Sequence, residues 1–168
     1  MRIESPAATR GDTIGLDVEL VLRDMDPSDL ELVTRIEADC YKTAWTLEMF
    51  TDELRERTSW HRVAGGLGEK VVGYLVGRYY PDLWHLMNLA VPLSLRRKGI
   101  GGTLLDEFLE AADAVSMGVL LEARPSNEDA ISLYLQRGFS VMGLRRGYYT
   151  DNNEDALVMT RGSHSGRR

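Results

Sequence analysis

The spacing of apolar residues predicts short strands alternating with amphipathic helices along most of the chain. Apolar residues that alternate with polar ones, or form runs of strand length, are typical of β-strands. By this pattern the predicted strands are residues 18–22, 62–64, 71–79, 84–91, 119–123, 139–144 and 156–160. Apolar residues three or four positions apart predict a helix in each of four intervening segments.

Each predicted helix has a boundary signal. Asp26-Pro27 places an N-cap before a proline, and Thr46 can cap the second helix. The longest helix carries an apolar stripe whose successive spacings are four, four, three and four, formed by Ile100, Leu104, Phe108, Ala111 and Val115. We expect this stripe to lie on a sheet. The fourth helix follows Ser126-Asn127 and ends at Gly138.

This order, β-α-α-β-β-β-α-β-α-β-β, predicts an α/β (α+β) fold. We expect a mixed, mostly antiparallel central sheet of about seven strands flanked by about four helices, with a parallel crossover around the long helix. A chain of 168 residues is the size of one domain. We expect a flexible leader at residues 1–15, the domain at 16–161 and a disordered tail at 162–168.

A basic, glycine-rich loop joins the predicted strand 84–91 to the long helix. It begins after Leu89, Ala90 and Val91, presents the cations Arg96, Arg97 and Lys98, and continues as Gly99, Ile100, Gly101 and Gly102. Glycines let an anion approach the backbone, and the helix N-terminus adds partial positive charge. The loop therefore predicts a pyrophosphate site, although a solvent-exposed basic helix start fits the motif equally well. A P-loop would need a lysine between Gly102 and Thr103.

Composition narrows the class of partner. The net charge of −6 argues against general nucleic-acid binding and weakly favours a basic protein substrate. The single cysteine, Cys40, excludes an internal disulfide, suits a reducing cytoplasm, and lies among apolar residues that suggest packing. No apolar run approaches the roughly 20 residues of a membrane span. Residues 1–15 lack the apolar segment of a secretory signal.

Two side chains are candidates for proton transfer. Glu122 lies in the apolar strand 119–123, where partial burial would raise the pKa of its carboxyl group. A salt bridge to Arg124, or an edge position facing water, is the alternative explanation for a carboxylate there. Tyr134 follows twelve residues later on the next helix, where a packing tyrosine is the simpler interpretation. No nucleophilic cysteine or serine is placed for a covalent acyl-enzyme.

Several motifs occur together in the order of one known family. Arg96-x-x-Gly99-x-Gly101 resembles the acetyl-CoA loop of GCN5-related N-acetyltransferases (GNAT). The remaining motifs are Asn88-Leu89-Ala90-Val91, Leu121-Glu122-Ala123-Arg124, Ser126-Asn127, Leu133-Tyr134, Gly138-Phe139, Arg145-Arg146-Gly147-Tyr148-Tyr149 and Glu154-Asp155-Ala156. Together they resemble the bacterial ribosomal-protein-alanine N-acetyltransferases (RimI type) over about residues 18–160.

The resemblance implies a role for each motif. Acetyl-CoA would be held through the backbone of Leu89, Ala90 and Val91, through the loop from Arg96 to Gly102, and through Asn127. Glu122 would be the proton acceptor and Tyr134 the proton donor to the thiolate. Tyr148 and Tyr149, placed by the sequence pattern in a long hairpin loop and expected on opposite faces, would bind peptide. Trp45 would wall the N-terminal pocket or simply pack, and packing is the safer interpretation.

This sequence departs from the family pattern at two positions, but the resemblance still implies a reaction. Pro92 and Pro125 replace residues that are usual in the family. The loop at residues 150–153 is also short, so the resemblance does not fix the identity of the substrate. We expect direct acetyl transfer from acetyl-CoA to a protein N-terminus, with a ribosomal protein's alanine as the leading substrate. The alternatives are acetylation of a small amine or lysine side chain, and a non-catalytic CoA-binding module. No metal, nucleic acid or membrane is expected, and the protein would be a cytoplasmic monomer or weak dimer.

Overall fold

A computed structural model describes residues 13–14, 18–66, 70–115 and 117–163. Its strands are β1 (Thr13–Ile14), β2 (Val18–Asp24), β3 (Ser59–Gly66), β4 (Val71–Tyr80), β5 (Leu83–Ala90), β6 (Gly118–Ala123), β7 (Ser140–Tyr149) and β8 (Glu154–Arg161). Its α-helices are α1 (Leu30–Cys40), α2 (Leu47–Arg55), α3 (Ile100–Ala114) and α4 (Glu128–Gln136), and short 3-10 turns precede α1 and α3. The expected leader and tail lie mostly outside the described residues.

The strands follow the order β1-β2-β3-β4-β5-β6-β8-β7. The pairs β1–β2, β2–β3, β6–β8 and β7–β8 are antiparallel, whereas β5 and β6 are parallel. Because α3 connects β5 to β6, the predicted parallel crossover around the long helix is confirmed. The mixed sheet and four helices also confirm the predicted fold, with the two-residue strand β1 as an addition.

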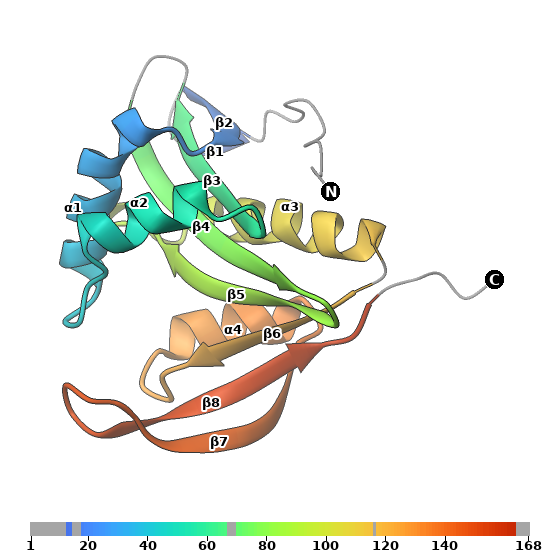
Figure 1. Cartoon of the computed structure of the whole chain (residues 1–168). Helices are drawn as coiled ribbons and strands as arrows, with labels where there is room; N and C mark the ends of the chain where they lie inside the picture. The colour runs from blue at the N-terminus through green and yellow to red at the C-terminus, as the bar shows by residue number, and fades with distance from the viewer. Residues whose placement is uncertain (1–12, 15–17, 67–69, 116, 164–168) are drawn as a thin grey trace. The chain divides into compact units, whose positions relative to one another are not determined.

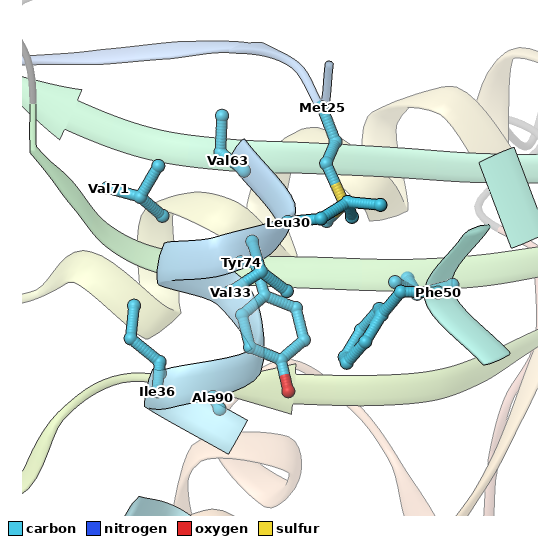
Figure 2. Close-up of a cluster of buried hydrophobic side chains, with 10 residues drawn as sticks. Met25, Leu30, Val33, Ile36, Phe50, Val63, Val71, Tyr74 and Ala90 are labelled. Atoms are coloured by element: carbon cyan, nitrogen blue, oxygen red, sulfur yellow. The ribbon is translucent and has the colours of Figure 1, made fainter. Parts of the chain in front are cut away.

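The chain forms two compact units, each with its own apolar interior. The first comprises residues 1–76 and 88–105. Its core combines the apolar stripe of α1 with residues of α2, β3, β4 and β5 and with the residue that follows β2, namely Met25, Leu30, Val33, Ile36, Phe50, Val63, Val71, Tyr74, Val76 and Ala90. Figure 2 shows this cluster, in which the Tyr74 ring meets that of Phe50 edge-on with centroids 5.4 Å apart.

The second unit comprises residues 77–87 and 106–168. Trp84 of β5 packs edge-on against Phe108 of α3, with ring centroids 5.6 Å apart. Gly77 of β4 is required here, because a Cβ at this position would lie 2.2 Å from the Phe108 ring. Strand β7 forms the outer edge of the sheet beyond β8 (Figure 1).

The C-terminal hairpin differs from the prediction in one respect. We expected the strand to end near Leu144 and a long loop to hold the two tyrosines, but β7 continues to Tyr149. A register shift between Arg145 and Tyr149 lets the strand continue with irregular pairing. Period-two patterning does not indicate a bulge, so the extra strand length was missed. The connection between β7 and β8 is only residues 150–153.

Candidate active site

Two residues just before α3 have positive φ angles. Gly99 has a φ of 84°, and Arg97, two residues before it, has a φ of 63°. A Cβ on Gly99 would find no heavy atom within 4 Å, so the space beside this backbone is open. Helix α3 begins at Ile100, and the Gly99 carbonyl accepts a 2.9 Å bond from the Thr103 amide. The first-turn amides of Ile100, Gly101 and Gly102 therefore lie at a helix N-terminus, where no intrahelical acceptor exists for them.

The three cations of this loop have different environments. The Arg96 Nε donates to the Val91 carbonyl at 3.0 Å, so this guanidinium is tied to the end of the preceding strand. Arg97 is exposed, and Lys98 is half-buried. Arg96 is thus tied to the end of β5, whereas the Arg97 side chain is the exposed one of the three.

The end of β5 is already engaged by neighbouring side chains. The Leu89 carbonyl accepts a 2.5 Å bond from the Tyr41 hydroxyl, and the Val91 carbonyl accepts the Cys40 thiol at 3.5 Å. Pairing of β5 with β6 covers Leu83–Leu86, so Leu89 and Ala90 lie beyond it. The predicted contact of this backbone with the acetyl and pantetheine end of acetyl-CoA stays a prediction.

Glu122 is held by two donors from neighbouring strands. Its Oε2 lies 2.6 Å from the His85 Nε2 on β5, and its Oε1 accepts a 2.8 Å bond from Arg145 Nη1 on β7. The Glu122 side chain is only 9% exposed. The structure therefore surrounds the predicted proton acceptor with an imidazole and a guanidinium.

These contacts correct the expected acidity of Glu122. We expected burial to raise the pKa of this carboxyl group, but the hydrogen bond from His85 lowers it below its usual value, and Arg145 lowers it further. Burial acts in the opposite direction and is outweighed. The alternative of a salt bridge to Arg124 is also wrong, because the ion-pair partners are His85 and Arg145.

His85 is the site residue that the sequence analysis missed. It pairs in register with Leu120, two residues before Glu122, so all three side chains lie on the same face of the β5–β6 pair. The signal was present in the sequence: His85 is polar between the buried residues Trp84 and Leu86. Only strand pairing, however, could place it beside Glu122.

Helix α4 carries two predicted residues. Tyr134 is buried, its ring packs near Phe139 at a centroid distance of 5.7 Å, and burial raises the pKa of its hydroxyl. This phenol therefore stays protonated at neutral pH, as a proton donor must. Asn127 is the N-cap of α4, where its side-chain oxygen accepts a bond from the Ala130 amide at 3.2 Å.

The two tyrosines at the end of β7 lie against each other and against two arginines. Their rings are perpendicular with centroids 5.1 Å apart, which corrects the expectation that adjacent strand residues would point to opposite faces. The Arg145 guanidinium lies 4.7 Å from the Tyr148 ring centroid, and Arg124 lies 3.8 Å from that of Tyr149. The irregular pairing between Arg145 and Tyr149 accounts for the departure from regular alternation.

Trp45 packs rather than forms an open wall. Its ring is 5.3 Å from that of Phe50, and its amide donates to the Glu37 carboxylate at 2.8 Å. Glu37 is buried and also accepts bonds from the Tyr74 hydroxyl and the Asn88 amide. The packing interpretation of Trp45 is therefore the one that the structure favours.

The predicted site residues fall into two groups, one in each unit. The first unit holds the α3 start and the end of β5, and the second holds Glu122, Tyr134, Asn127 and the tyrosine pair. Among the residues that the structure describes, no cluster of three or more His, Cys, Asp or Glu side chains is suited to a metal. None of the helices described is both long and apolar enough to span a membrane.

Known proteins resemble this chain over most of its length. The sequence profile of the acetyltransferase (GNAT) family matches residues 30–139. The N-alpha-acetyltransferase RimI of Mycobacterium tuberculosis is 33% identical over 143 residues, covering 81% of this chain and 88% of that protein.

Two solved structures share the fold. The ribosomal-protein-S18-alanine N-acetyltransferase of Escherichia coli superposes with a TM-score of 0.79 at 27% identity, covering 89% of this chain and 97% of that one. Naa20 of Chaetomium thermophilum, solved with a bisubstrate analogue, gives a TM-score of 0.76 at 26% identity and covers 84% and 86% of the two chains. With the family profile spanning more than half of its residues, the chain belongs to the acetyltransferase (GNAT) family.

Proposed function

We propose that this protein transfers the acetyl group of acetyl-CoA to the α-amine at the N-terminus of a protein. The observation that carries the proposal is the placement of Glu122 between His85 and Arg145, with Arg145 also stacked on Tyr148. A candidate proton acceptor is thereby joined by direct contacts to a pair of exposed and half-buried tyrosines. A protein N-terminus offers both an amine to deprotonate and peptide groups that such tyrosines can bind.

His85 and Glu122 would share the removal of the amine proton. A carboxylate whose pKa is lowered is ionised at neutral pH, so Glu122 attracts the substrate's ammonium group but accepts its proton weakly. The bond to Glu122 fixes the orientation of the His85 ring, whose imidazole can accept the amine proton. The amine then attacks the thioester carbonyl directly, and the buried Tyr134 hydroxyl donates a proton to the departing thiolate.

The start of α3 would hold the diphosphate of acetyl-CoA. The open space beside Gly99 and the helix N-terminus at Ile100 suit a bulky anion approaching the backbone closely. Arg97 would supply a full positive charge, and Asn127 would bind the pantetheine arm. The chemistry of this donor set fits acetyl-CoA and calls for no metal ion.

The leading substrate is the N-terminal alanine of a ribosomal protein, by analogy with the ribosomal-protein-S18-alanine N-acetyltransferase of E. coli. The net charge of −6 agrees with a basic substrate such as a ribosomal protein. A substrate of this kind places the reaction in the cytoplasm. A pocket closed by Trp45 would favour a small amine as substrate. Because Trp45 instead packs on Phe50, acetylation of a small amine is less supported.

A peptide panel tests the proposal. Purified protein is given acetyl-CoA with Ala-, Ser- and Met-initiated peptides, the same peptides with blocked N-termini and an internal lysine, and small amines. We expect turnover of the free N-terminal peptides, with the Ala-initiated peptide best, and none of the blocked ones. Acetylation of blocked peptides at lysine, or of small amines alone, would overturn the N-α assignment.

A further inference from the structure

Arg124 lies at the centre of a polar cluster that the proton-transfer steps do not use. It directly follows β6, and its guanidinium reaches two residues of the β7–β8 connection and the first residue of β8. Nη2 donates to Asp151 at 2.8 Å, while Nη1 donates to Asn152 and to Glu154, both at 3.1 Å. The same guanidinium covers the Tyr149 ring at 3.8 Å from its centroid. All of these residues belong to the second unit.

The carboxylates of this cluster are ionised at neutral pH, and each of them accepts hydrogen bonds. Glu154 also accepts a bond from the Ser126 amide at 2.9 Å, and bonds from this residue lower the pKa of the Glu154 carboxyl to about 2. The hydrogen bond from Arg124 lowers the pKa of Asp151. A planar guanidinium can bond two carboxylates along its edge while its face lies on an aromatic ring, whereas a lysine ammonium cannot do both.

The contacts continue from this cluster to Glu122. Tyr149 lies against Arg124 on one side and meets the Tyr148 ring edge-on. Tyr148 lies against Arg145, which donates to Glu122. Arg124 is therefore the fixed end of a row of packed side chains that contains both predicted peptide-binding tyrosines.

We propose that Arg124 is a positioning residue that sets the Tyr149 ring and the 150–153 connection for binding the substrate peptide. The proposal rests on the proposed function, because it assumes that the tyrosine pair binds peptide. It also explains how a connection of only four residues can present a defined surface: Asp151, Asn152 and Glu154 all bond one side chain outside the hairpin. The identity of the residues at positions 150–153 would then govern which N-terminal residues of a substrate the protein can bind.

The chain offers a closely matched control. Arg137 forms a two-bond pair with Asp106 at 2.6 and 3.0 Å, and its side chain is 20% exposed against 21% for Arg124. Arg137→Gln thus removes an arginine of equal exposure from the same unit without touching the tyrosine pair. The variants Arg124→Gln and Arg124→Lys are compared with Arg137→Gln, measuring KM for an Ala-initiated peptide, KM for acetyl-CoA, kcat and Tm.

We expect Arg124→Gln to raise the peptide KM about tenfold while the KM for acetyl-CoA stays within about twofold, because only peptide-binding groups are misplaced. Arg124→Lys, which keeps the charge and guards against a failure of the glutamine variant to fold, should give a smaller rise. Arg137→Gln should lower Tm and leave both KM values unchanged. Equal peptide KM values for Arg124→Gln and Arg137→Gln, or parallel rises in both KM values, would overturn the proposal.

Hydrogen exchange separates this proposal from the proposed function. In protein without substrate, the amides of residues 147–155 should exchange faster in Arg124→Gln and at the wild-type rate in Arg137→Gln. Faster exchange with an unchanged peptide KM would show a purely structural role and contradict the positioning role. A wild-type protein that acetylates no peptide N-terminus would instead defeat the proposed function, and the positioning role with it.

Discussion

At the scale of single residues, the properties of Glu122 are set by neighbours from other strands. The sequence singled out Glu122 because a carboxylate is unusual in an apolar strand, and the structure confirms its partial burial. Burial alone would have raised its pKa, yet His85 and Arg145 reverse the direction. Neither partner could be predicted from the sequence, because they lie 37 and 23 residues away along the chain and meet Glu122 only through strand pairing.

The lowered pKa of Glu122 leads to a prediction about pH. Because the pKa of this carboxyl group lies below its ordinary value, it stays ionised as the pH falls through the neutral range, so Glu122 cannot produce a loss of activity there. We therefore expect Glu122→Gln to lower kcat/KM by a similar factor at every pH across the neutral range. His85→Gln should lower kcat/KM about 100-fold, as for loss of a group that accepts the amine proton.

The control for this prediction is His61→Gln. His61 is a half-buried histidine on β3, in the unit that does not contain Glu122. Its substitution should leave kcat/KM unchanged, whatever its effect on stability. A wild-type kcat/KM in His85→Gln would show that another group takes the proton.

At the scale of elements, the sequence predicted the helices better than the C-terminal hairpin. Thr46 caps α2 as expected, and the predicted apolar stripe of α3 begins at the buried Ile100. These signals are local, because caps and helical periodicity depend on residues within a few positions. Strand β7 was predicted too short because its irregular pairing with β8 depends on the partner strand.

The loop before α3 provides a prediction with a single physical cause. Gly99 has a left-handed φ of 84°, and an added Cβ would contact nothing, so Gly99→Ala introduces backbone strain without a clash. We expect a loss of about 1–2 kcal/mol in the free energy of unfolding, the cost of placing an alanine in the left-handed region. We also expect an increase in the KM for acetyl-CoA, because relief of the strain would turn the loop amides away from the diphosphate.

Gly99→Asn is the matched variant, since asparagine tolerates the left-handed region better than alanine does. Its loss of stability, measured by urea unfolding, and its rise in acetyl-CoA KM should both be smaller. If Gly99→Ala binds acetyl-CoA as tightly as the wild type, the loop does not hold the coenzyme through its backbone.

At the scale of the whole molecule, the order of strands and helices was predictable, and so was the family. The motifs from Arg96 to Ala156 occur in the order of the GNAT enzymes, and the profile match and the shared fold confirm that resemblance. The role of each residue was less predictable. The loop at α3 and the Glu122 group belong to different compact units, and each was recognised from its own local chemistry. A reaction in one ternary complex requires that both groups act on one bound pair of substrates.

The most direct test of this requirement is calorimetric titration with a bisubstrate analogue, CoA joined through an acetyl linker to an Ala-initiated peptide. CoA and the peptide are also titrated separately. We expect one molecule of the analogue to bind per chain, with an affinity about 100-fold higher than that of CoA alone. The reason is that linked groups that reach both subsites bind as one ligand. Both Gly99→Ala and Arg124→Gln should weaken that binding. An analogue that binds no more tightly than CoA would contradict the account.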